Sequence, residues 1–202
     1  MLGPAQFVPH NKETSMSNLP APGVYDVDTV HSTIGFVARH LVASKVRGRF
    51  TDFSGQITIG DSAELSSVVA TAQAASVTTD NEMRDGHLRT ADFLEVETYP
   101  TLTLRSTKVT PKGGDRYEVL ADVTIKDVTK SVAFDVEFLG AGPGMAPGVT
   151  VAGFEARAEV DRRDFNVNFE GALENGSLVV GHKIVLELAV EVAAQVSVPA
   201  NA

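Results

Sequence analysis

The chain has 202 residues, with 17 Lys or Arg against 26 Asp or Glu, so its formal net charge is −9 at pH 7. A hydrophobic content of 43% is typical of one folded domain, while the acidic balance and the scattered cations argue against nucleic acid as a partner. The absence of cysteine excludes disulfides, thiolate metal sites and cysteine nucleophiles.

The first 22 residues are expected to form a disordered leader, because prolines and polar residues interrupt every apolar stretch in them. This segment lacks the basic start and the apolar run of a secretory signal. No later run approaches the roughly 20 apolar residues that a transmembrane helix needs. We therefore expect no transmembrane segment, a cytoplasmic location, a barrel domain over 23–195 and a C-terminal tail over 196–202.

From Val24 onward, apolar and polar residues alternate in most segments, which is the spacing of strands with one buried and one exposed face. Short links between these segments favour an antiparallel meander. Long strands with one apolar face close most readily into a barrel, so the expected fold class is all-β, an antiparallel barrel of about eight strands. The strands are expected at 33–41, 53–60, 67–77, 101–107, 116–125, 131–138, 151–161 and 183–192.

One short helix is expected between the strands, over 83–94. Thr79 and Glu82 have the spacing of a capping box, in which a hydroxyl and a carboxylate bond the first free N–H groups of a helix. Pro100 then marks the return to an extended chain. A helix between antiparallel strands makes no crossover, so we expect it to cap one end of the barrel, which we call the mouth.

Small residues on two expected inward faces indicate a cavity. Ala70 and Ala72 lie on one strand and Ala156 on another, and a barrel of about eight strands is wide enough to hold one small ligand. Phenylalanines on the other strands offer the alternative of a fully packed interior. The residue pattern alone leaves both possibilities open.

Signals for catalysis and for metal binding are weak. The sequence has no Gly-x-Ser-x-Gly elbow and no His-Glu-x-x-His spacing, and His31 and His40 would lie on opposite faces of a regular strand. His87 lies among charged residues that suit acid/base chemistry, although such a run also suits a solvated helix face. We expect no metal site and no cofactor.

Several ordered blocks, extending over about Val24 to Val192, resemble the YceI-like family. Where family members often carry an aromatic residue shortly after the last block, this chain has Phe169. The blocks are VDTVHSTIGF (27–36), SKVRGRFTDFSG (44–55), NEMRDGHLR (81–89), DFLEVETYP (92–100), VTIKDVT (123–129) and RRDF (162–165).

The resemblance implies an extended, eight-stranded, lipocalin-like antiparallel barrel that binds an isoprenoid lipid for storage or transport. The implied ligand is a polyprenyl diphosphate or an isoprenoid quinone, and the family has no known enzymatic reaction. The resemblance also suggests a homodimer. The tail is expected to contact Phe36, Phe50, Phe53, Ile57, Ala72, Leu102, Leu104, Phe134, Phe138, Phe154, Ala156 and Phe165.

The polar head group is expected at the mouth, because a helix that caps one end places its side chains there. The candidates are His40, Arg84, His87 and Arg163. Two other functions stay open. One is an enzyme that acts on a small lipid-like substrate with His87 or His40 as acid/base, and the other is a stress-response interaction module with a packed barrel.

Overall fold

The computed structural model describes residues 19–41, 44–171 and 179–194. Its helices are α1 (Glu82–Arg89) and the short 3-10 turns η1 (Ala63–Leu65), η2 (Ala74–Ser76) and η3 (Arg162–Phe165). Its strands are β1 (Gly23–Val27), β2 (Thr33–His40), β3 (Ser44–Phe50), β4 (Phe53–Ile59), β5 (Ser67–Gln73), β6 (Val77–Thr78), β7 (Thr101–Gly113), β8 (Arg116–Ile125), β9 (Val128–Pro143), β10 (Thr150–Asp161) and β11 (Val180–Ala194).

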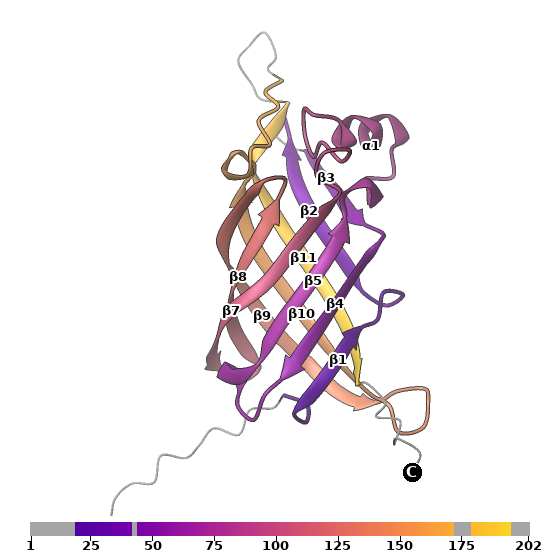
Figure 1. Ribbon diagram of the computed structural model, residues 1–202, viewed down its shortest axis with the longest axis vertical. Helices are drawn as coiled ribbons and strands as arrows, with labels where there is room; N and C mark the ends of the chain where they lie inside the picture. The colour runs from indigo at the N-terminus through magenta and orange to yellow at the C-terminus, as the bar shows by residue number, and fades with distance from the viewer. Residues whose placement is uncertain (1–18, 42–43, 172–178, 195–202) are drawn as a thin grey trace, which may run out of the picture.

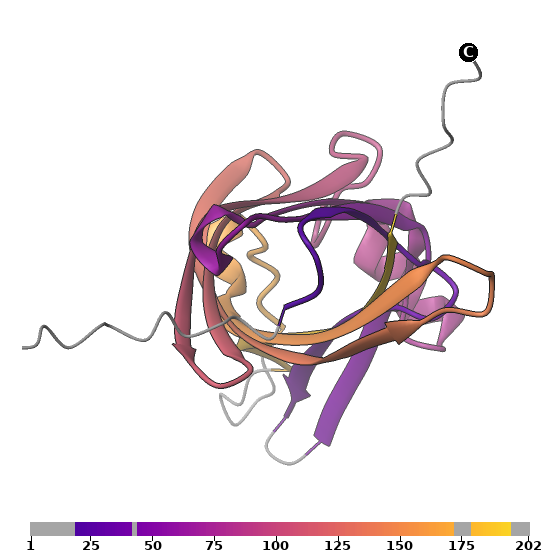
Figure 2. The ribbon, with the colours of Figure 1, turned by 90° about the horizontal axis from the view of Figure 1, so that it is seen from below.

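The strands form one closed antiparallel barrel (Figures 1 and 2). The ladder runs β1-β4-β5-β7-β8-β9-β10-β11 and closes because β11 also pairs with β1. Three of the eight strand positions in the barrel wall are each occupied by two consecutive short strands. These pairs are β1 with β2, β3 with β4, and β5 with β6. The prediction of an eight-stranded antiparallel barrel is therefore confirmed.

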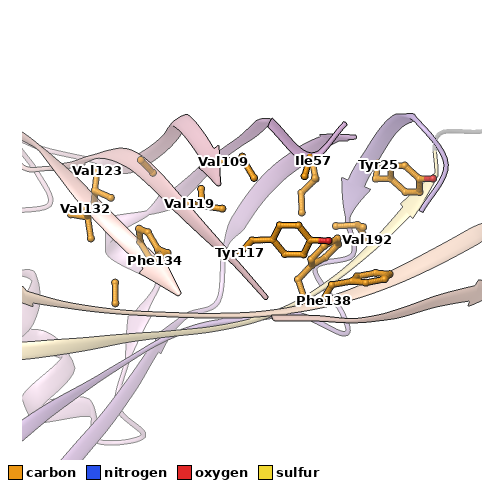
Figure 3. Packing of buried hydrophobic residues seen from close by; sticks show 14 of the residues in the cluster. Tyr25, Ile57, Val109, Tyr117, Val119, Val123, Val132, Phe134, Phe138 and Val192 are labelled. Carbon is orange, nitrogen blue, oxygen red and sulfur yellow. The ribbon is translucent and has the colours of Figure 1, made fainter. Parts of the chain in front are cut away.

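The predicted alternation sends the apolar side chains inward. On β8, Tyr117, Val119, Ala121 and Val123 are all buried. Figure 3 shows such side chains pointing into the barrel from several strands. At the end away from α1, the interior is packed with large residues that belong to the main hydrophobic cluster, including Tyr25, Tyr117, Phe138 and Val192.

The helix α1 lies at one end of the barrel, as predicted (Figure 1). The predicted capping box is wrong, because the N-cap is Asn81, whose side chain accepts a hydrogen bond from the Arg84 backbone N–H at 3.0 Å. The helix also ends at Arg89 rather than at Leu94. No helix in the described part of the chain is long and apolar enough to cross a membrane.

A strand that the alternation did not predict, β3, pairs with β2 along its whole length. Residues 19–22 are also part of the described structure, and Leu19 packs against the main hydrophobic cluster. The rest of the expected leader and the expected tail over 196–202 lie outside the described residues.

Candidate functional site

An apolar cavity of about 330 Å³ occupies the interior of the barrel. Among the described residues that line it, Arg162 is the one charged side chain. The volume lies in the range of about 300–1,000 Å³ that is typical of small-molecule sites. Because a cavity lined by apolar groups offers water no hydrogen-bond partners, an apolar ligand can enter it without displacing tightly held water.

The structure brings together all but one of the residues predicted to contact the tail. Phe138 is the exception, because it is buried at the packed end of the barrel, where its ring centroid lies 5.3 Å from that of Phe154. The predicted residues that line the cavity are Phe36, Phe50, Phe53, Ile57, Ala72, Leu102, Leu104, Phe134, Phe154, Ala156 and Phe165.

A second hollow, of about 220 Å³, lies beside the cavity at the end where α1 is found, and we call it the vestibule. Residues of β2, β3 and α1 line it, together with Phe169. The two hollows adjoin, because the same side chains contribute to both linings. These shared residues are Phe36, Ala38, Leu88, Phe93 and Val180.

Three of the four predicted head-group residues, His40, Arg84 and His87, line the vestibule. The Arg84 guanidinium is held on one side, where Nε donates to Thr79 Oγ1 at 2.7 Å and Nη2 donates to the Thr79 carbonyl at 3.0 Å. Its Nη1 has no hydrogen-bond partner within the described ranges. One edge of an anchored cation is thus left for a ligand.

Thr79 connects Arg84 to a buried carboxylate, that of Asp85. The Thr79 hydroxyl and backbone N–H both donate to Asp85 Oδ1, and the Thr78 hydroxyl donates to Oδ2 at 2.8 Å. Burial alone would raise the pKa of Asp85, but these hydrogen bonds outweigh it and the pKa is below its ordinary value. Asp85 therefore stays ionised and fixes the start of α1 against the barrel.

His87 lies in an aromatic cluster on the vestibule wall. Its ring packs edge-on against Phe93 and Phe169, with centroids 5.0 Å apart in each case. Its Nε2 lies 2.8 Å from Asp92 Oδ2, and this contact fixes the orientation of the ring. His87 is therefore held at the vestibule wall by two aromatic rings and one carboxylate.

The fourth predicted head-group residue, Arg163, lines neither hollow. It is exposed, and its guanidinium bonds Asp161, with Nη2 2.6 Å from Oδ2, which lowers the pKa of that carboxyl. Its neighbour Arg162 is buried instead and lines the cavity. The sequence-based prediction therefore chose the exposed arginine of this pair and not the one that faces inward.

Arg162 is held by backbone carbonyl oxygens rather than by a carboxylate. Nη1 donates to Val167 at 2.6 Å and Nε donates to Gly181 at 3.1 Å. Burial lowers the pKa of Arg162 from its usual value, but the guanidinium stays charged at neutral pH. These bonds tie the segment after η3 to the start of β11 next to the cavity.

A separate polar group lies at the turn between β1 and β2, where Asp28, His31 and Glu191 offer ligand atoms within 4.8 Å of one another. Its own hydrogen bonds account for the arrangement, since Asp28 accepts from the Val30 N–H at 2.8 Å and lies 2.9 Å from His31 Nδ1. The His31 side chain is exposed, and the group stabilises the turn.

The comparisons with known proteins agree with this geometry. The sequence model of the YceI-like domain matches residues 25–192. A UPF0312 protein of Staphylococcus epidermidis is 36% identical over 169 residues, which cover 83% of this chain and 95% of that protein. The structure of the Campylobacter jejuni YceI protein has a TM-score of 0.68 at 29% identity, covering 78% of this chain and 90% of that one.

A further solved structure is described as a polyisoprenoid binding domain from Saccharophagus degradans. It has a TM-score of 0.62 at 17% identity and covers 84% of this chain and 98% of its own. At this level of identity the likeness shows a common fold.

Proposed function

Since the chain belongs to the YceI-like family, we propose that its barrel binds an isoprenoid lipid, with the tail in the cavity and the head group in the vestibule. The observation that carries this proposal is an apolar interior that adjoins a second hollow, at the end with the helix, whose lining includes His40, Arg84 and His87. The structural neighbour that is described as polyisoprenoid-binding supports the choice of ligand class. The lipid is a polyprenyl diphosphate or an isoprenoid quinone, bound for storage or transport.

The two hollows differ in the chemistry they offer. The cavity can remove a hydrocarbon chain from water, and each buried methylene contributes about 0.8 kcal/mol. The vestibule offers the free edge of Arg84 and the imidazoles of His40 and His87, which suit a diphosphate or a quinone carbonyl. Arg163 is not part of the proposed head-group site, because it lines neither hollow.

Mass spectrometry of organic extracts from the purified protein tests the proposal against the two alternatives. A stoichiometric, chemically intact prenyl lipid supports binding. A prenyl lipid that the protein converts during incubation would instead support an enzyme that uses His87 or His40. A barrel that retains no lipid and takes up none when supplied with prenyl compounds would support a packed interaction module.

Affinity is expected to rise with the number of prenyl units and then to level off once the cavity is filled. A five-carbon unit supplies about 3 to 4 kcal/mol of gross burial energy before ordering costs. Calorimetric titration with dimethylallyl, geranyl, farnesyl and geranylgeranyl diphosphates measures the dependence, with inorganic diphosphate as the control without a tail. Equal affinities along this series would show that tail burial is not the basis of binding.

Changing Arg84 and His87 together to Gln is expected to weaken farnesyl diphosphate binding about tenfold or more, because two partners of a charged head group are lost. The remaining affinity should depend less on salt. Arg163→Gln is the matched control, since it removes one cation outside both hollows. If the double variant bound as tightly as the control, a diphosphate in the vestibule would be ruled out and a quinone favoured.

A further inference from the structure

The β2–β3 hairpin carries positive charge that the chain as a whole lacks. Residues 29–51 contain four Lys or Arg and no Asp or Glu, although the net charge of the protein is −9. On each strand of the hairpin the cations alternate with residues that line the cavity or the vestibule. Lys45, Arg47 and Arg49 therefore lie on the outer face of β3, and Arg39, the ladder partner of Lys45, lies beside them at the edge of the vestibule. We call these four exposed cations the basic face.

Most of this charge is not neutralised within the protein. Arg49 pairs with Asp80 at 3.0 Å, whereas Arg39, Lys45 and Arg47 are exposed and have no acidic side chain within ion-pair distance in the described ranges. Arg39 and Lys45 are also direct partners across the β2–β3 ladder. Like charges in that position destabilise a strand pair, so the basic face does not serve the stability of the fold.

Exposed apolar side chains lie at the end of β2 and on α1. Leu41, at the turn of the hairpin, is 39% exposed, and Met83 on α1 is 88% exposed. Arg39 itself lines the vestibule, together with Arg84 of α1. Cations and exposed apolar groups therefore occupy the two elements between which the vestibule lies.

We propose that the basic face docks the barrel on an anionic lipid bilayer, with the end of the barrel that holds the vestibule next to the bilayer surface. Lys and Arg near an anionic leaflet are attracted to it, and apolar side chains beside them enter the boundary between head groups and acyl chains. This inference rests on the proposed function and extends it, because a bilayer is where a lipid with a long tail is taken up or released.

The pairing of cations with apolar side chains favours a bilayer over an acidic protein or a nucleic acid. A polyanion would gain from Arg39, Lys45 and Arg47 but would leave Leu41 and Met83 in water. A bilayer uses both, since its surface is charged and the layer beneath it is apolar. The acidic remainder of the chain is repelled by the same surface, which orients the barrel with the basic face toward the lipid.

Vesicle sedimentation tests the docking directly. The unmodified protein should sediment with vesicles of phosphatidylcholine and phosphatidylglycerol in equal parts and should stay in solution with phosphatidylcholine alone. Binding should be lost in about 1 M NaCl, where the screening length falls to about 3 Å. Equal sedimentation with both kinds of vesicle, or binding to heparin without binding to the anionic vesicles, would overturn the proposal.

Charge reversal locates the surface. Lys45→Glu with Arg47→Glu should weaken partitioning onto the anionic vesicles about 30-fold or more, since each cation near such a surface accounts for about a fivefold gain. The matched control is Lys108→Glu with Lys130→Glu, which makes the same charge change on exposed residues of β7 and β9. Equal losses in both variants would show that net charge, and not the basic face, governs the binding.

Two further measurements separate docking from ligand binding and from misfolding. Met83→Ser should weaken vesicle binding, whereas Met145→Ser, at a fully exposed methionine in the loop between β9 and β10, should not. Dispersed farnesol, a neutral probe, should bind the charge-reversed variant as well as the unmodified protein. Failure of farnesol to bind the unmodified protein would refute the proposed function, while failure of vesicle binding alone would refute only the docking.

Discussion

Replacing Ala156 with Phe is expected to displace lipid from the barrel while the protein stays folded. Ala156 lies on β10 between Val136 and Leu188 of the neighbouring strands, and all three line the cavity of about 330 Å³. The added ring would therefore enter unfilled volume. We expect co-purified prenyl lipid to fall below detection and Tm to change little, as measured by extraction with mass spectrometry and by thermal unfolding.

The matched control is Ala189→Phe on β11, next in the chain to the cross-strand partner of Ala156 but exposed on the outer face. It should leave both lipid content and Tm unchanged. In a packed interior, Ala156→Phe would instead overfill the core and cost about 1 to 3 kcal/mol. A strongly destabilised Ala156→Phe protein with normal lipid content would therefore contradict the proposed cavity site.

Replacing Arg162 with Met is expected to cause a large loss of stability. Met keeps much of the volume of the side chain but donates no hydrogen bond, so the carbonyls of Val167 and Gly181 lose their donor. Leaving a buried acceptor unpaired costs about 1 to 3 kcal/mol. For two acceptors we expect a loss of about 3 kcal/mol, which lowers Tm by about 6–12 °C in a chain of this size.

Arg163→Met provides the comparison, because it removes the neighbouring guanidinium at an exposed position. The ion pair with Asp161 is expected to contribute at most about 1 kcal/mol, as exposed pairs do. Thermal and denaturant unfolding of both variants measures the difference. Similar losses for Arg162→Met and Arg163→Met would show that the buried hydrogen bonds are not what stabilises this end of the barrel.

The barrel could be predicted from alternation because most of its strands place apolar residues on every inward position. The strand β3 escaped prediction because one of its inward positions is Gly48. A Cβ at that position would come within 2.3 Å of the Phe36 ring, so any other residue would force Phe36 to move, and the glycine leaves room for that ring. Packing against a residue of another strand cannot be read from local periodicity.

The start of α1 shows a different limit of local reasoning. Thr79 and Asn81 can both cap a helix, and the sequence does not rank them. In the folded chain Thr79 is buried, and its hydroxyl donates to Asp85, which leaves the cap to Asn81. Which of the two residues caps the helix therefore depends on the contact between Thr79 and Asp85. That carboxylate is buried only when α1 packs against the barrel, so the sequence does not reveal the contact.

The cavity wall could be predicted from strand parity, and its role in ligand binding stays a prediction. Phe138 has the right parity, but it lies among the large residues that fill one end of the barrel. Alternation predicts which face of a strand a residue occupies, but not how far along the barrel axis that residue lies. Arg162 and Arg163 lie in η3, where the period of two no longer applies. Nothing local distinguishes which of the two arginines faces inward.

The barrel closes between strands from opposite ends of the chain. Tyr25, Asp26 and Val27 pair with Ala194, Ala193 and Val192, and β2 also pairs with β11. These partners are separated along the chain by nearly the whole domain. During synthesis, the edges of β1 and β2 that pair with β11 therefore stay unpaired until β11 has left the ribosome. The nascent chain is consequently most exposed to aggregation just before its last strand emerges, and its folding is completed only after translation of the domain has ended.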